Sequence, residues 1–287
     1  FLGDNSTISC CEVLNNLIFP AHEQHHNNSF LIASLVMGQS NMAAGATIGS
    51  NHNSRANDNE IVAGRGFWPG LCTSLKHSSR FASYVLISKA DYPAELDIPF
   101  PFALVNNNYS SDRLEVTPAF WWIHNMYALA RNSWKFLNRD KSFKKIQHIE
   151  FNYLAPDTAE EIIHSLYLLE LWTGKLLVLN NKQNPSALPE DIILKTGRDF
   201  LLSGEPEPEG FFIYGEGLEK TLRPSVILHP RRSYQAYREM LLYYAFGTII
   251  ARLNTDKAAT LSSIFKEYSA DPQRDLVNLG GQLVPKR

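Results

Sequence analysis

The chain has 287 residues, which is enough for one large domain or two domains of ordinary size. Hydrophobic residues make up 44% and charged residues 20%, as in a soluble globular protein, and the formal net charge of -2 argues against nucleic-acid and membrane partners. Three cysteines, of which Cys10 and Cys11 are adjacent, exclude a disulfide framework and indicate the reducing environment of the cytoplasm.

A six-residue repeat marks residues 36–53. An apolar residue recurs at every sixth position, as Val36, Met42 and Ile48, and glycine and alanine occupy many of the positions between. Neither the helical period of about 3.6 nor the strand period of two gives this spacing. It is typical of a parallel β-helix, in which the aliphatic residue points toward the axis and small residues turn the corners.

The same spacing extends back to the first residues, because Leu2, Ile8 and Leu14 continue it. The chain starts inside this repeat and without a methionine, so we expect it to be the C-terminal part of a longer protein. Two polar breaks, at residues 20–28 and 54–60, predict loops that leave the stack of coils and return to it.

The composition changes after residue 91. Residues 92–116 hold three prolines among short apolar stretches, which predicts an extended connector or a small edge sheet that caps the stack of coils. Thr117 and Pro118 are suited to begin a helix. We therefore expect β-helix coils over 1–91, a connector over 92–116 and a mainly α-helical domain over 117–287. The first helix of that domain is expected from an apolar stripe of Phe120, Ile123, Tyr127, Ala130, Trp134 and Leu137.

The first break contains the HExxH sequence of residues 22–26. In zinc proteases two such histidines bind the metal from one face of a helix, and the glutamate activates a bound water. Here Pro20 precedes the motif and β-helix repeats flank it, so a helix is not expected. The alternatives are a solvated polar loop, a ligand-binding or catalytic loop over the coils, and a metal site using His22 and His26.

The densest polar cluster spans residues 51–60 and includes the second break. Asn51, Asn53, Arg55 and Asp58 surround His52, and these amide, guanidinium and carboxylate groups suit a polyhydroxylated or phosphorylated ligand. His52 is the candidate general base, since an imidazole titrates near neutral pH. Alternatively, the asparagines occupy left-handed corners, a conformation that they tolerate well.

A third group of polar residues comprises Arg65, Lys76 and His77. Arg65 lies between two glycines, where the backbone can approach a ligand closely. The 25 positions from His52 to His77 equal one coil of about 18 residues and a loop of about seven, so the two histidines can lie on one side of neighbouring coils.

Two resemblances follow from these motifs. The repeats resemble the left-handed β-helix of hexapeptide acyltransferases and the related domains of sugar-nucleotide enzymes. Residues 20–29, 51–55 and 64–72 are similar to an uncharacterised family, carried largely by gut Bacteroidetes, with a β-helix and a C-terminal extension. The second resemblance covers most of the chain. The expected fold is therefore a left-handed parallel β-helix followed by a mainly α-helical domain.

The acyltransferase resemblance implies a function. In that class a histidine deprotonates a sugar hydroxyl or amine, which attacks an acyl thioester between the subunits of a trimer. The implied catalytic residues are His52 first, with His25, His26 and His77 as alternatives. The implied ligand contacts are Asn51, Asn53, Arg55, Asp58, Arg65 and Lys76.

The expected substrates are a sugar or nucleotide-sugar and acyl-CoA as co-substrate, with no tightly bound cofactor. Two other functions remain open. One is a non-catalytic scaffold that binds carbohydrate or mediates assembly, and the other is a metal-dependent hydrolase built on residues 22–26.

Overall fold

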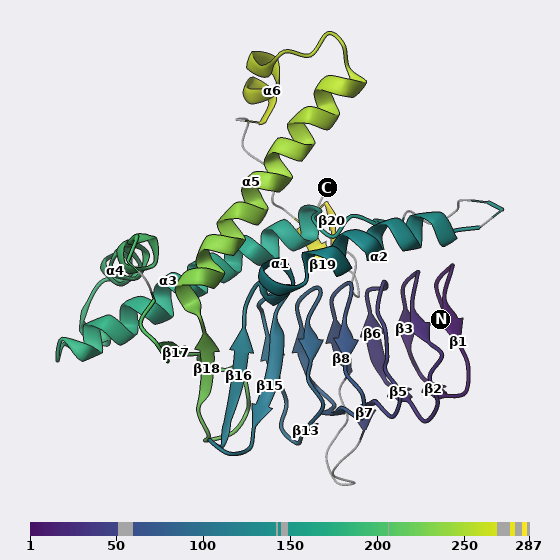
Figure 1. Ribbon diagram of the computed structural model, residues 1–287, viewed down its shortest axis with the longest axis horizontal. Coiled ribbons are helices and arrows are strands. Elements are labelled where there is room, and N and C mark those ends of the chain that lie inside the picture. Colours follow the sequence, from purple (N-terminus) through teal and green to yellow (C-terminus); the bar gives the residue numbers. More distant parts are fainter. Residues whose placement is uncertain are drawn as a thin grey trace. The chain divides into compact units, whose positions relative to one another are not determined.

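The computed structural model describes residues 1–50, 60–141, 143–144, 149–205, 207–268, 276–278 and 283–285. The chain forms two compact units, Phe1–Tyr237 and Arg238–Arg287. The first unit begins with a parallel β-solenoid of about five turns, and a helical region follows (Figure 1). The predicted class, a parallel β-helix followed by helices, is confirmed.

Three parallel ladders of short strands form the sides of the solenoid. The first comprises β1 (Thr7–Ile8), β4 (Glu23–Gln24), β9 (Trp68–Pro69), β12 (Leu86–Ile87) and β15 (Leu104–Asn108). Asn41 connects β4 to β9, because it forms a parallel bridge with Glu23 and its backbone N–H donates to the carbonyl of Phe67. The second comprises β2 (Glu12–Leu14), β5 (Phe30–Ile32), β7 (Thr47–Ser50), β10 (Ser74–Lys76) and β13 (Asp91–Tyr92). The third comprises β3 (Leu17–Ile18), β6 (Ser34–Val36), β8 (Ile61–Ala63), β11 (Arg80–Phe81) and β14 (Asp97–Ile98).

The core of the solenoid is a column of aligned side chains. In the second ladder Leu31, Ile48, Leu75 and Tyr92 pair in register, and all four are fully buried. Ile48 and Leu75 pair although residues 51–59 lie between them in the sequence, and the register shifts by one residue at Lys76, which pairs with Ser50. Removal of this apolar surface from water, at roughly 25 cal/mol per Å2, favours the stacked coils.

The break at residues 20–28 is not a loop that leaves the stack, which corrects the sequence interpretation. Strand β4 lies inside it and pairs in parallel with β1. His22, Gln24 and Ser29 are buried there and hydrogen-bond to one another or to neighbouring coils. A polar interior of this kind is stable because its donors and acceptors are satisfied inside the protein.

The solenoid ladders also extend into residues 92–116, where the sequence predicted a connector. Strands β14 and β15 continue the third and first ladders. Strand β16 (Arg113–Thr117) then pairs antiparallel with β15, and β18 (Ser225–Leu228) and β17 (Phe212–Tyr214) extend the same sheet. These strands cover the backbone edge that the last coil would otherwise expose.

The described helices are α1 (Phe120–His124), α2 (Met126–Arg139), α3 (Pro156–Asn180), α4 (Glu190–Leu202), α5 (Pro230–Thr255) and α6 (Leu261–Tyr268), with a short 3-10 turn at Pro185–Ala187. Helix α2 runs across the corners of the coils (Figure 1). Among the helices that the structure describes, α3 is long and apolar enough to cross a membrane by length and composition alone. A core helix of a soluble protein meets the same criterion, and α3 packs along α4.

Helices α3 and α4 cross at two glycines. A Cβ atom on Gly174 would lie 2.0 Å from the Ile193 carbonyl oxygen, and one on Gly197 would lie 1.9 Å from the Glu170 carbonyl oxygen. Both distances are far below van der Waals contact, so the two backbones can approach this closely only because neither residue has a side chain.

We therefore expect Gly197→Ala to lower the free energy of unfolding by roughly 1–3 kcal/mol, because the helices must move apart. Urea unfolding followed by circular dichroism measures the loss. Gly247→Ala is the matched control, since nothing lies within 4 Å of its added Cβ and alanine favours the helix by up to about 1 kcal/mol. Equal effects of the two substitutions would contradict the close crossing.

Candidate functional site

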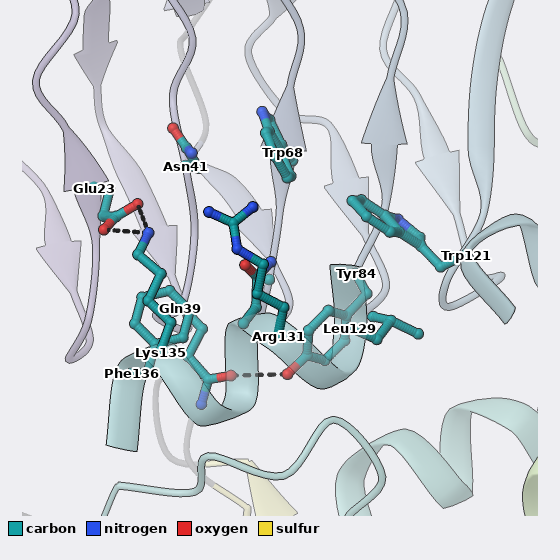
Figure 2. A pocket seen from close by; sticks show the side chains of 12 residues that line it. Glu23, Gln39, Asn41, Trp68, Tyr84, Trp121, Leu129, Arg131, Lys135 and Phe136 are labelled. Atoms are coloured by element: carbon teal, nitrogen blue, oxygen red, sulfur yellow. Dashed lines mark hydrogen bonds and ion pairs between the residues drawn. The ribbon is translucent and has the colours of Figure 1, made fainter. Parts of the chain in front are cut away.

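A cavity of about 190 Å3 lies between the solenoid and helix α2 (Figure 2). The solenoid contributes Glu23, Gln39, Asn41, Gly66, Trp68 and Tyr84. The helical wall consists of Trp121 from α1 and Leu129, Arg131, Asn132, Lys135 and Phe136 from α2. The cavity therefore combines aromatic walls with amide groups and cations, which is a composition typical of small-molecule sites.

Coil stacking places the solenoid residues of the cavity in a row on the first ladder. Asn41 forms a parallel bridge with Glu23 in the preceding coil. Its backbone N–H donates to the carbonyl of Phe67, the residue before Trp68, in the following coil. Because register is maintained from coil to coil, Glu23, Asn41 and Trp68 all face α2.

The corner between the third and first ladders supplies Gln39, Gly66 and Tyr84. Gln39 and Tyr84 both have positive φ, at 49° and 58°. A Cβ atom on Gly66 would lie 2.3 Å from the Tyr84 ring, so the ring can cover this position only because residue 66 is glycine. The Tyr84 hydroxyl donates to Gln39 Oε1 at 2.8 Å, and its ring stacks on Phe102 (Figure 2).

Helix α2 is attached to the row through Glu23. Lys135 Nζ lies 2.8 Å from the carboxylate of Glu23, and Arg139 Nη1 lies 3.0 Å from it. Leu129 and Phe136, on the same helix, are buried beside the coils. The ion pairs and the apolar contacts together hold α2 over the first ladder.

Two buried polar atoms of the cavity have no hydrogen-bond partner among the residues that the structure describes. Asn41 Oδ1 and Trp121 Nε1 are buried and unsatisfied. Arg131 makes no ion pair or hydrogen bond with a described residue. Buried polar groups are nearly always paired, so Asn41 and Trp121 indicate a place where water or a ligand completes the site, whereas Arg131 is exposed and its guanidinium is open to water or a ligand.

His22 contradicts the metal-hydrolase interpretation of the HExxH motif. Its Nδ1 lies 2.8 Å from Ser40 Oγ and its Nε2 lies 3.1 Å from Gln24 Oε1, so both ring nitrogens are engaged inside the coil. Residues 23–24 form a strand instead of a helix, and Glu23 points out toward α2. Within the described ranges, no group of three His, Cys, Asp or Glu side chains could hold a metal ion.

Burial lowers the pKa of the His22 imidazole to about 4, against the opposing effects of Gln24 and Glu23. In the unfolded chain a histidine titrates near pH 6.5. The part of the unfolding free energy that depends on a neutral His22 is therefore fully present above about pH 6.5. It is lost as the pH falls toward 4.

We expect His22→Ala to lower the free energy of unfolding near pH 7 by roughly 1–3 kcal/mol, because Ser40 and Gln24 lose a buried partner. The wild-type protein should lose more stability than the variant between about pH 7 and pH 5. Urea titrations at both pH values measure this. His25→Ala, an exposed neighbour, should change stability by less than about 0.5 kcal/mol. Identical pH dependence in wild type and His22→Ala would rule out a buried neutral imidazole.

The other candidate bases do not line the cavity. The rings of His25 and His26 are exposed, with centroids 4.4 Å apart. His77 is only 3% exposed, and its Nδ1 lies 3.1 Å from Ser78 Oγ. A substrate would reach His77 only if the surrounding coil opened.

The remaining candidates, His52 with Asn51, Asn53, Arg55 and Asp58, lie outside the described residues, and their roles stay predictions.

The structure gives Arg65 and Lys76 protein partners where the sequence suggested an anionic ligand. Arg65 forms a bidentate ion pair with Asp157, at 2.6 and 2.9 Å, and donates to the carbonyls of Glu150 and Asn152. Lys76 lies 2.7 Å from Glu95. The fixed geometry of a guanidinium suits such a bidentate contact, which ties α3 to the coils.

A second carboxylate, one helical turn after Asp157, also joins α3 to the solenoid. Glu161 accepts from the Ser83 backbone N–H at 3.0 Å and from the Ser83 hydroxyl at 3.2 Å. Burial raises the pKa of the Glu161 carboxyl to about 7, and the charge of Asp157 adds to the effect. Its folded-state pKa therefore lies above that of an unfolded glutamate.

The folded protein favours the protonated carboxyl of Glu161, so its contribution to the unfolding free energy is fully present below about pH 4.5. That contribution is lost as the pH rises through 7. We expect wild type to lose more unfolding free energy than Glu161→Gln when the pH is raised from about 5 to about 8. Urea titrations at the two pH values test this. Glu160→Gln changes an exposed neighbour of the same charge and should behave like wild type. A Glu161→Gln response equal to wild type would contradict the raised pKa.

Sequence analysis missed Arg131, Lys135, Trp68 and Trp121 as site residues. A signal for the cations was present, since Arg131, Lys135 and Arg139 recur at every fourth position and so share one helix face. The tryptophans gave none, because apolar rings in a helix or coil are usually core.

The chain is similar to an uncharacterized protein of Treponema pallidum (strain Nichols), with 50% identity over 284 residues. The match covers 98% of this chain but only 37% of the relative's own length. No family model and no solved structure matches the chain. The predicted Bacteroidetes family and the relation to acyltransferases therefore stay predictions, while the β-solenoid and its helical extension rest on the structure.

Proposed function

We propose that this chain binds a sugar or nucleotide-sugar in the cavity of Figure 2 and presents it for a transferase reaction, with acyl transfer as the expected chemistry. The observation that carries the proposal is the pair of buried unsatisfied atoms, Asn41 Oδ1 and Trp121 Nε1, together with the exposed guanidinium of Arg131, beside the Trp68 and Tyr84 rings. A β-solenoid scaffold is also consistent with hexapeptide-repeat transferases.

The lining suits a carbohydrate for two reasons. Aromatic rings offer a flat apolar face against which the C–H groups of a pyranose can pack. The amides of Asn41 and Asn132 supply donors and acceptors for hydroxyl groups. The volume of about 190 Å3 is below the roughly 300–1,000 Å3 of pockets for drug-sized ligands, so it suits one sugar ring with the remainder of a larger ligand outside.

A non-catalytic binding function is the second candidate. The cavity is lined by no histidine among the described residues, and its one carboxylate, Glu23, is held by Lys135 and Arg139. The proposed acyl transfer therefore depends on His52 as the base, with acyl-CoA and assembly into a trimer as further parts of the proposal.

We expect calorimetric titration to detect binding of UDP-glucose or a free hexose, and Trp68→Ala to weaken it about tenfold, a loss of ~1.4 kcal/mol. Trp134→Ala is the matched control, because Trp134 lies on α2, is 67% exposed and does not line the cavity. Absence of binding for a panel of hexoses and nucleotide-sugars, or equal losses in both variants, would overturn the proposed site.

The same titrations separate the two functions when combined with release of free CoA from acetyl-CoA. Turnover that disappears in His52→Ala while sugar binding persists supports acyl transfer. Sugar binding without turnover from any acyl-CoA supports the non-catalytic scaffold.

A further inference from the structure

One face of α2 carries a row of cations toward the solenoid. Arg131, Lys135 and Arg139 are spaced by four residues, so they lie on the same side of the helix. Lys135 and Arg139 share the single carboxylate of Glu23, and Arg131 lines the cavity beside them. Three cations thus face one anion.

We propose that the cavity binds a phosphorylated sugar, with Arg131 as the main phosphate contact and Glu23 as an internal counterion that the phosphate partly displaces from Lys135. The proposal rests on the proposed function and deepens it by naming the charged group of the ligand. A sugar phosphate and the diphosphate of a nucleotide-sugar share this chemistry.

Arg80, Arg131 and Arg232 of the first unit form no ion pair with a described carboxylate, and of these three Arg131 lines the cavity. The arginines of this unit with carboxylate partners are Arg65 with Asp157, Arg113 with Glu115, Arg139 with Glu23, Arg198 with Glu170, and Arg223 with Glu219. Arg131 has no such partner among the residues that the structure describes. Figure 2 shows its guanidinium extending from α2 toward the strands that carry Asn41 and Trp68. A guanidinium in that position can bind phosphate oxygens through two parallel hydrogen bonds.

The charge balance of the cavity favours an anion. Among its lining residues Arg131 and Lys135 are positive and Glu23 is negative, and Arg139 adds a further positive charge at the rim, where it is 62% exposed. Glu23 reaches Lys135 and Arg139 at 2.8 and 3.0 Å, so an added phosphate would compete with it for Lys135. The partly enclosed site strengthens this attraction relative to water.

The unsatisfied amide and indole define the rest of the ligand. Asn41 Oδ1 requires a donor, which a phosphate dianion cannot supply but a sugar hydroxyl can. Trp121 Nε1 requires an acceptor, which a hydroxyl or phosphate oxygen provides. A ligand with hydroxyl groups beside a phosphate satisfies all three groups of the cavity, whereas inorganic phosphate alone leaves Asn41 unpaired.

The test is calorimetric titration of the folded protein with glucose 1-phosphate, glucose, inorganic phosphate and UDP-glucose at constant ionic strength. We expect glucose 1-phosphate to bind more tightly than glucose or phosphate. Arg131→Gln should weaken glucose 1-phosphate at least about tenfold, because it removes a charge-assisted bidentate contact. Lys195→Gln, an exposed cation on α4, controls for the loss of one positive charge and should bind like wild type.

Glu23→Gln gives the second, opposite readout. Removal of the internal counterion frees Lys135 and Arg139, so affinity for glucose 1-phosphate should rise severalfold while affinity for glucose does not. Melting temperatures confirm that each variant is folded. Weaker phosphate binding in Glu23→Gln, or unchanged binding in Arg131→Gln, would overturn the proposal.

The panel also separates this inference from the proposed function. Binding of glucose and glucose 1-phosphate with equal affinity, lost in Trp68→Ala, overturns the phosphate site and leaves the sugar site standing. Arg131-dependent binding of inorganic phosphate without binding of any sugar compound overturns the proposed function and the sugar-phosphate assignment together. Tighter binding of UDP-glucose than of glucose 1-phosphate supports the inference with a nucleotide-sugar as the source of the phosphate.

Discussion

Coil-to-coil register is the constraint on which the cavity and its neighbouring contacts depend. In the first ladder Trp68, Leu86 and Leu104 pair one above another at intervals of 18 residues, and Glu23 and Asn41 continue the row. Successive strand residues point to opposite faces, so a slip by one residue would turn the row from α2 into the interior. The backbone hydrogen bonds between coils therefore determine which side chains meet the helix.

Polar contacts at the coil corners then fix the helical region. Arg65 holds Asp157, and Ser83 holds Glu161, so two consecutive turns of α3 are attached to adjacent corners of the solenoid. Glu23 holds α2 in a similar way through Lys135. In each case one partner is carried by a coil, whose position is set by the ladders, and the helix adapts to it. The cavity is the space left between α2 and the row of outward-facing side chains.

The sequence was most informative where apolar spacing decides the structure. The spacing of Val36, Met42 and Ile48 predicted a β-helix, and all three residues are fully buried in the solenoid. Hydrophobic periodicity could not identify the coil at residues 20–28, because its interior is made of His22 and Gln24 instead of aliphatic side chains. Their burial becomes clear only from partners in other coils, such as Ser40.

The candidate site was less accessible to sequence reasoning. Arg65 and Lys76 are cations that the sequence analysis assigned to an anionic ligand. The carboxylates that neutralise them could not be recognised in the sequence, because Asp157 is distant along the chain and Glu95 belongs to another coil. Arg131 is an exposed arginine, and only the folded chain shows that it lines a cavity with Asn41 and Trp121.

Residues 51–59 stand between β7 and β8, and the ladders on both sides pair in parallel, with one register irregularity where Lys76 pairs with Ser50. The solenoid therefore separates the length of that segment from the geometry of the cavity, which is built on the first ladder and its corner with the third. Sequence changes there are free to accumulate without moving Glu23, Asn41 or Trp68.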